Sequence, residues 1–398
     1  MAVHRHVFSK LTLSTFIFAA AIASANAQDA SAVADRVKQL MANQGTEISW
    51  SAINGSGSSF KLEGVKLSFA GHAAPLELGN VSFEGVSDDN GGYRIESIST
   101  EAYTTTEDGA TIEISPFKTT GLKVPAAGST DPMAQMLFAE GAELASLSVK
   151  LGDKTPFSLE GFSVEVTPPA DGKPIEFSGA AEKFTADLSL VTDPQAKAAI
   201  EAMGYQTING SLDMAGSWQL SDGRMGLSQF DVTVDNAGTF GMTYDIGGYT
   251  PDFIKAMQDV QKQMAAQPEG ADNSAQGLAM LGLMQQLTFQ AASLRWDDDS
   301  LTGKVIDYVA KLQNMKPEDI KNQAKAIVPF LTAQLNNPDL SAALTAAVTK
   351  YLDDPQSLEI SAEPASPVPF SQIAASSMAD PMALTKSLGV TVTANEEE

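Results

Sequence analysis

The chain has 398 residues, a formal net charge of −24, 43% apolar residues and no cysteine. This length and apolar content indicate a globular protein with a sizeable core. The acidic balance argues against nucleic acid as a partner, because lysine and arginine carry that binding. The absence of cysteine excludes thiolate nucleophiles, iron–sulfur clusters and cysteine-ligated zinc.

The first segment has the order of a secretory signal. Arg5 and Lys10 precede an apolar core over 11–23, and small residues follow at the positions that a signal peptidase reads. We expect cleavage between Ala27 and Gln28. The apolar core is shorter than the ~20 residues of a membrane span, and no later run reaches that length. We therefore expect a mature chain without a transmembrane segment, located in the periplasm or secreted.

The pattern then changes from a short amphipathic helix over 31–43 to alternation with a period of two over 47–190. Such alternation, broken by turn residues, is typical of antiparallel strands. Three related segments place a glycine where the alternation slips by one residue, at Gly64, Gly85 and Gly161. A slip of one residue would turn a strand inside out. We therefore expect these structural glycines to form bulges or sharp bends.

The second half opens with a helix over 193–204, capped by Asp193 and ended by Gly204. A β-meander follows, in which 221–224 with Gly223 predicts a hairpin turn. Further elements are expected from periodicity and from proline at first helical positions. The expected helices cover 251–267, 277–286, 304–314, 317–335, 338–353 and 380–388. The expected strands cover 287–296, 358–360 and 390–392.

Together these patterns predict an α+β protein. We expect a large curved antiparallel sheet with packed helices and a helix-rich C-terminal third. After the signal over 1–27, a β-rich region covers 28–190. A helix, the β-meander and the C-terminal helices cover 191–398. The two regions form either separate domains or one continuous domain.

Few residues are suited to catalysis. His4 and His6 leave with the signal, so a serine–histidine–acid triad would depend on His72, which lies at a predicted strand end and favours a structural role. The acidic clusters at 88–91 and 297–299 lack the ligand spacing of a calcium loop and suit turns. We therefore expect no catalytic residue, no cofactor and no metal. A hydrolase based on carboxylates or a bound metal is the least favoured alternative.

One stretch resembles a known unit. Met203-Gly204-Tyr205 precedes a strand that ends in Trp218-Gln219-Leu220-Ser221-Asp222-Gly223, and Asn236-Ala237-Gly238-Thr239-Phe240 follows. This order is similar to a unit of exported Gram-negative proteins of the YdgA-like and AsmA-like groups. The resemblance implies an envelope protein with a long curved sheet that handles lipid, and it supplies no functional residues. AsmA-like proteins typically have an N-terminal membrane helix, whereas this chain has a cleavable signal.

Two functions follow from these observations. The first is a non-catalytic periplasmic envelope protein that binds an apolar or lipid ligand in a groove of the curved sheet. The alternative is an acidic structural or protein-interaction module without a ligand pocket, whose partner is a basic envelope protein. The two differ in whether helices close the inner face of the sheet.

Overall fold

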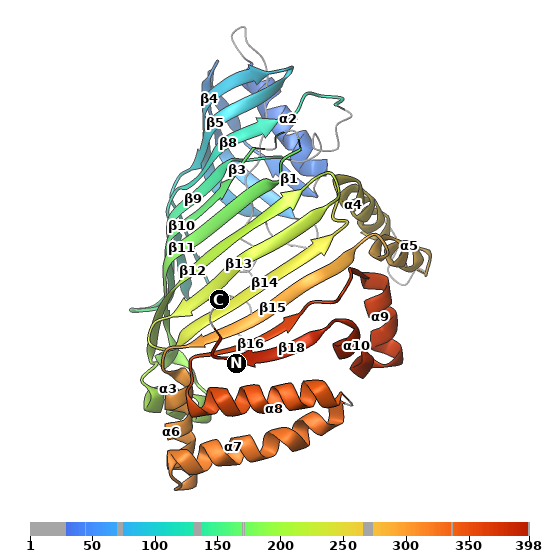
Figure 1. Cartoon of the computed structure of the whole chain (residues 1–398). Helices are drawn as coiled ribbons and strands as arrows, with labels where there is room; N and C mark the ends of the chain where they lie inside the picture. Colours follow the sequence, from blue (N-terminus) through green and yellow to red (C-terminus); the bar gives the residue numbers. More distant parts are fainter. Residues whose placement is uncertain are drawn as a thin grey trace. The chain divides into compact units, whose positions relative to one another are not determined.

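The computed structural model describes residues 29–43, 45–69, 75–129, 137–168, 170, 172–265, 274–335 and 337–396. The expected cleavage site at Ala27 and Gln28, and His72, lie outside these ranges. Of the described residues, 46% lie in strands and 34% in helices. The chain divides into two compact units, one drawn from Met1–Pro168 with Phe177–Ala186 and the other from Pro169–Glu176 with Asp187–Glu398 (Figure 1).

The first unit consists of one helix and a set of antiparallel strands. Its elements are α2 (Ala30–Asn43), β1 (Thr46–Ser49), β2 (Ala52–Ser56), β3 (Ser59–Phe69), β4 (Leu76–Asp89), β5 (Gly92–Thr100), β6 (Tyr103–Glu107), β7 (Ala110–Ile114), β8 (Phe117–Val124), β9 (Gly141–Leu151), β10 (Lys154–Val166) and β11 (Ile175–Asp187). Helix α2 buries Val33, Val37 and Leu40 in one core with strand residues such as Leu62 and Ile95. The helix thus closes part of this sheet.

The three glycines that the sequence singled out lie inside these strands and have left-handed backbone conformations. The φ angles are +60° at Gly64, +65° at Gly85 and +63° at Gly161. The pairing register of β4 with β5, and of β10 with both neighbours, is the same on either side of the glycine. These two strands therefore bend without inserting a residue. In β3 the register with β4 shifts between Leu62 and Val65, so that strand is irregular at its glycine.

A glutamate from a neighbouring strand covers each of the two bends. A methyl group on Gly85 would overlap the carboxylate of Glu96, and one on Gly161 would overlap that of Glu182. The glutamate side chain thus lies against the backbone of the glycine on the neighbouring strand. A side chain at either glycine would meet both this glutamate and the strain of a positive φ.

A third glutamate, Glu140, forms a two-pronged ion pair with Arg94. The guanidinium nitrogens Nη1 and Nη2 donate to Oε1 and Oε2 of Glu140 at 2.6 and 2.7 Å. The hydrogen bond from Arg94 lowers the pKa of Glu140 below its ordinary value of 4.5. A carboxylate with a lowered pKa stabilises the fold above its ordinary value, and this contribution is lost as the pH falls through the lowered pKa.

We therefore expect the Glu140→Gln variant to lose stability relative to the parent at about pH 7, and to lose progressively less below about pH 4. Urea unfolding of both proteins across this range measures the difference. Glu165→Gln, at an exposed position on β10, is the control for a changed net charge. A stability difference for Glu140→Gln that is constant over the whole range would contradict the prediction.

The second unit alternates helices with the strands of one antiparallel sheet. Its elements are η2 (Leu188–Leu190), α3 (Pro194–Met203), β12 (Thr207–Gln219), β13 (Arg224–Val234), β14 (Gly238–Gly247), α4 (Pro251–Ala265), α5 (Ser274–Met284), β15 (Thr288–Asp298), α6 (Leu301–Gln313), α7 (Pro317–Thr332), η3 (Ala333–Leu335), α8 (Pro338–Asp353), β16 (Ser357–Ala362), β17 (Val368–Pro369), α9 (Phe370–Ala379), α10 (Pro381–Ser387) and β18 (Val390–Ala394). The strands pair in the order β12-β13-β14-β15-β16-β18, and β17 pairs with one end of β15.

The expected α+β class with a helix-rich C-terminal third is wrong. Strands exceed helices among the described residues, and the C-terminal third is not helix-rich. Strands β15, β16, β17 and β18 lie between the C-terminal helices in sequence and join one sheet in space. The sequence predicted β16 and β18 as short strands over 358–360 and 390–392, but it did not show that they extend the same sheet as β15, because that pairing depends on residues far apart in the chain. The expected antiparallel pairing is confirmed.

The start of this unit is fixed by contacts around Tyr205. Asp193 caps α3 by accepting from the amide of Ala196, and Gly204 ends it with φ of +79°. The buried Tyr205 hydroxyl donates to the carbonyl oxygen of Asn236 at 2.8 Å, and the Lys304 ammonium lies 4.2 Å from the centre of the tyrosine ring. These contacts join α3, the β13–β14 turn and α6. The Gly-Tyr pair of the resembling stretch is therefore structural here.

Candidate functional site

The sheet of the second unit separates its side chains by polarity. Cross-strand pairing places apolar residues on one face of β14, β15 and β16, namely Phe240, Met242, Leu294, Trp296, Leu358 and Ile360. Residues next to them in sequence lie on the opposite face, namely Thr243, Ser293, Arg295, Asp297, Glu359 and Ser361. This separation follows from strict alternation, since successive side chains of a strand point to opposite faces.

Helices cover the two ends of the apolar face. At one end, Leu340, Ala347 and Tyr351 of α8 form a buried cluster with Val392 and Ala394 of β18. At the other end, Phe370 of α9 meets Phe289 edge to face with 6.5 Å between ring centres. Figure 1 shows the helices of this unit at the strand ends and beside β18.

Between these ends lie three neighbouring apolar residues that are largely uncovered. Phe240 on β14, Leu294 on β15 and Ile360 on β16 have exposed fractions of 40%, 45% and 44%. Leu294 lies directly opposite Ile360, and Phe240 lies diagonally across from Leu294. We call these three residues the central apolar patch. Scattered exposed apolar residues are ordinary, whereas contiguous ones mark interaction or ligand sites.

Three charged residues next to the patch in sequence, Arg295, Asp297 and Glu359, lie on the opposite face of the sheet. Arg295 donates to both carboxylate oxygens of Asp297 at 2.8 to 3.0 Å and forms an ion pair with Glu359 at 3.4 Å. On the apolar face, burial raises the pKa of the Tyr244 phenol, so this group stays neutral near neutral pH. The patch therefore offers apolar contact without a formal charge.

A polar cluster fixes the α8-covered end. The Oδ1 atom of Asp298 accepts from Trp296 Nε1 at 3.2 Å, from the amide and hydroxyl of Thr302 at 2.9 and 2.7 Å, and from the Tyr351 hydroxyl at 3.4 Å. Burial raises the pKa of Tyr351, so its hydroxyl keeps its proton. The cluster connects β15, α6 and α8, so its role is structural. In the described ranges, no three acidic or histidine side chains are placed to hold a metal ion.

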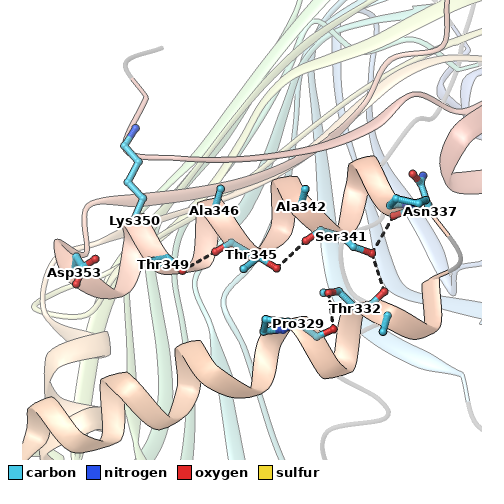
Figure 2. A pocket seen from close by; sticks show the side chains of 12 residues that line it. Pro329, Thr332, Asn337, Ser341, Ala342, Thr345, Ala346, Thr349, Lys350 and Asp353 are labelled. Atoms are coloured by element: carbon cyan, nitrogen blue, oxygen red, sulfur yellow. Dashed lines mark hydrogen bonds between the residues drawn. The ribbon is translucent and has the colours of Figure 1, made fainter.

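Figure 2 shows a different feature, a groove of about 900 Å³ between α7 and α8. Its hydroxyl groups bond to backbone carbonyls: Ser341 Oγ to Thr332, Thr345 Oγ1 to Ser341, and Thr349 Oγ1 to Thr345, at 2.7 to 2.8 Å. Because these donors are already used along the helices, the three hydroxyl groups have little to offer a polar ligand. It lies outside the central apolar patch.

The residues singled out from the sequence do not assemble into a site. Gly64, Gly85 and Gly161 lie in the first unit. Gly223 lies in the turn between β12 and β13 of the second unit with φ of +69°. The sequence missed the central apolar patch. Alternation placed its residues on strands, but no local signal tells which part of a sheet face the helices leave uncovered.

One comparison with known proteins covers part of the second unit. A family model described as "Uncharacterized protein" matches residues 231–395, which include the whole central apolar patch. No curated protein matches the chain. In the part of the chain that the structure describes, the helices are too short or too polar to span a membrane.

Proposed function

We propose that this protein is a non-catalytic component of the Gram-negative envelope, exported to the periplasm, and that its central apolar patch binds the hydrocarbon part of a lipid or similar ligand. The exposure of Phe240, Leu294 and Ile360 between two helix-covered ends carries this proposal. The signal-like first segment and the resemblance to YdgA-like and AsmA-like proteins support an envelope location.

The dimensions of the patch suit an alkyl chain. Neighbouring strands lie about 4.8 Å apart, so a ligand that crosses from β14 to β16 follows about 10 Å of apolar surface. Each methylene group removed from water there contributes about 0.8 kcal/mol. A patch without formal charge gives no ionic attraction to a head group, so the hydrocarbon supplies the affinity.

The alternative of an acidic interaction module predicts that helices close the sheet. The exposed fractions of 40% to 45% in the central apolar patch favour the ligand-binding hypothesis instead. Under this hypothesis acidic residues such as Asp297 and Glu359, on the other face of β15 and β16, keep the protein soluble.

The test places a charge in the patch. We expect Leu294→Glu to weaken binding of a fluorescent fatty-acid analogue by about tenfold or more, because burying an unpaired carboxylate costs more than the lost leucine contact. Thr391→Glu, which adds the same charge at an exposed position on the opposite face of β18, should bind as the parent does. Titration of delipidated protein measures both affinities.

Native mass spectrometry of parent protein purified without detergent gives the second measurement. A bound lipid that is lost in Leu294→Glu and kept in Thr391→Glu supports the proposal. Delipidated parent protein that binds no fatty-acid analogue, or equal affinity in the parent and Leu294→Glu, would overturn it.

A further inference from the structure

Helix α5 is apolar around its whole circumference, yet it lies at the surface. Leu283 is buried in a cluster with Phe253 of α4. By contrast, Leu278 and Leu281 have exposed fractions of 70% and 51%. A helix that is apolar on every side ordinarily lies in a protein core or in lipid. Its outward residues are therefore placed for contact with something apolar.

The neighbouring helix α9 carries a further exposed apolar side chain. It contacts α5, and both helices lie at the same end of the strands of the second unit (Figure 1). Met378 on α9 has an exposed fraction of 89%, the largest among the exposed large apolar residues of the described chain. We call Leu278, Leu281 and Met378 the helical apolar surface. It is formed by helices and is distinct from the central apolar patch on the strands.

The two helices that carry the helical apolar surface contain no charged residue. Neither α5 nor α9 contains an acidic or basic residue. Charged residues make up 19% of the chain, a fraction that predicts about four of them in two helices of this combined length. The hydroxyl of Ser377 donates to the carbonyl oxygen of Ala374 within α9 at 2.8 Å, so this polar group needs no water. Contact of the Ser377 hydroxyl with hydrocarbon therefore costs little desolvation.

We propose that the helical apolar surface docks on a lipid bilayer of no net charge, with Leu278, Leu281 and Met378 entering the boundary between head groups and acyl chains. Charge selects this partner. A net charge of −24 repels anionic lipids. The same charge opposes close approach of a second copy of the chain. A neutral bilayer avoids both repulsions and accepts the apolar side chains. This docking does not depend on ligand binding by the central apolar patch.

The test is flotation of the full chain with vesicles. We expect the parent to float with vesicles of phosphatidylcholine, and binding to be insensitive to salt because no ion pairs contribute. Vesicles that also contain phosphatidylglycerol should bind less. The double variant Leu278→Asp/Met378→Asp should lower the bound fraction about tenfold. Both positions are more than half exposed, and circular dichroism confirms the fold.

Leu312→Asp provides the matched control, because Leu312 on α6 is 67% exposed and lies outside the helical apolar surface. It should float as the parent does. The proposal would be overturned if the parent did not float, or if Leu312→Asp lost as much flotation as the double variant. Undiminished flotation of the double variant would also overturn it, since binding would then belong to another segment such as the apolar run over 11–23. A parent dimer that becomes monomeric in the double variant, without flotation of either, would show a second copy as the occupant. Leu294→Glu should float normally, which separates this test from that of the central apolar patch.

Discussion

Replacing Gly223 with alanine is expected to lower the free energy of unfolding by about 3 kcal/mol. The φ of +69° at this position costs an alanine roughly 1–2 kcal/mol. An added methyl group would also overlap backbone atoms of Tyr249 and lie 2.6 Å from the amide nitrogen of Thr250. This backbone is held in place, since the Tyr249 amide donates to the carbonyl oxygen of Gly223 at 2.9 Å. Relieving the overlap breaks that contact and adds a strain of about 1–3 kcal/mol.

The matched control is Gly204→Ala. Gly204 has a φ of +79°, and an added methyl group would meet nothing within 4 Å. The free energy of unfolding of this variant should therefore fall only by the cost of the left-handed backbone, about 1 kcal/mol. Urea unfolding of both variants measures the difference. Equal losses at the two glycines would show that crowding by residues 249 and 250 contributes nothing.

Removing the carboxylate of Asp298 is expected to cost about 2–3 kcal/mol. One oxygen of this side chain accepts from Trp296, Thr302 and Tyr351. In Asp298→Ala these part-buried donors lose a charged acceptor, and each such loss costs up to a few kcal/mol before water or relaxation compensates. The contacts of β15 with α6 and α8 should loosen together. Thermal unfolding and hydrogen exchange of the α8 amides measure this change.

Asp299→Ala is the control for Asp298→Ala. Asp299 is the next residue of the same acidic triplet and is exposed. Its backbone amide donates a hydrogen bond to the carbonyl oxygen of Ala237, and the substitution leaves this hydrogen bond in place. We expect its stability to stay within about 0.5 kcal/mol of the parent. A comparable loss of stability in both variants would show that the effect comes from the negative charge of the triplet rather than from the hydrogen bonds of Asp298.

The elements that the sequence predicted well are those set by neighbouring residues. Asp193 and Gly204 bound α3 because capping depends on groups within one helical turn. The turn at Gly223 likewise follows from the four residues that form it. Alternation predicted long antiparallel strands, since exposure of one face is encoded every second residue. These signals need no knowledge of the remainder of the chain.

The misses concern contacts between residues far apart in sequence. The helix-rich C-terminal third was predicted because β16 and β18 are short between long helices. In space they extend one sheet. The acidic triplet at 297–299 indicated only a turn, whereas Tyr351 makes Asp298 a fixed acceptor. The central apolar patch depends on where α8 and α9 pack, and periodicity within one strand carries no information about that.

The glutamates that lie over the bends also constrain how this sequence can change over evolutionary time. At each bend the glycine leaves a space that its partner on the next strand fills, Glu96 for Gly85 and Glu182 for Gly161. A larger residue can replace the glycine only if the partner has first become smaller. A smaller partner in turn uncovers bare backbone at the bend. We therefore expect the two residues of each pair to change together, so that an alignment of descendants would show covariation between positions 85 and 96 and between positions 161 and 182.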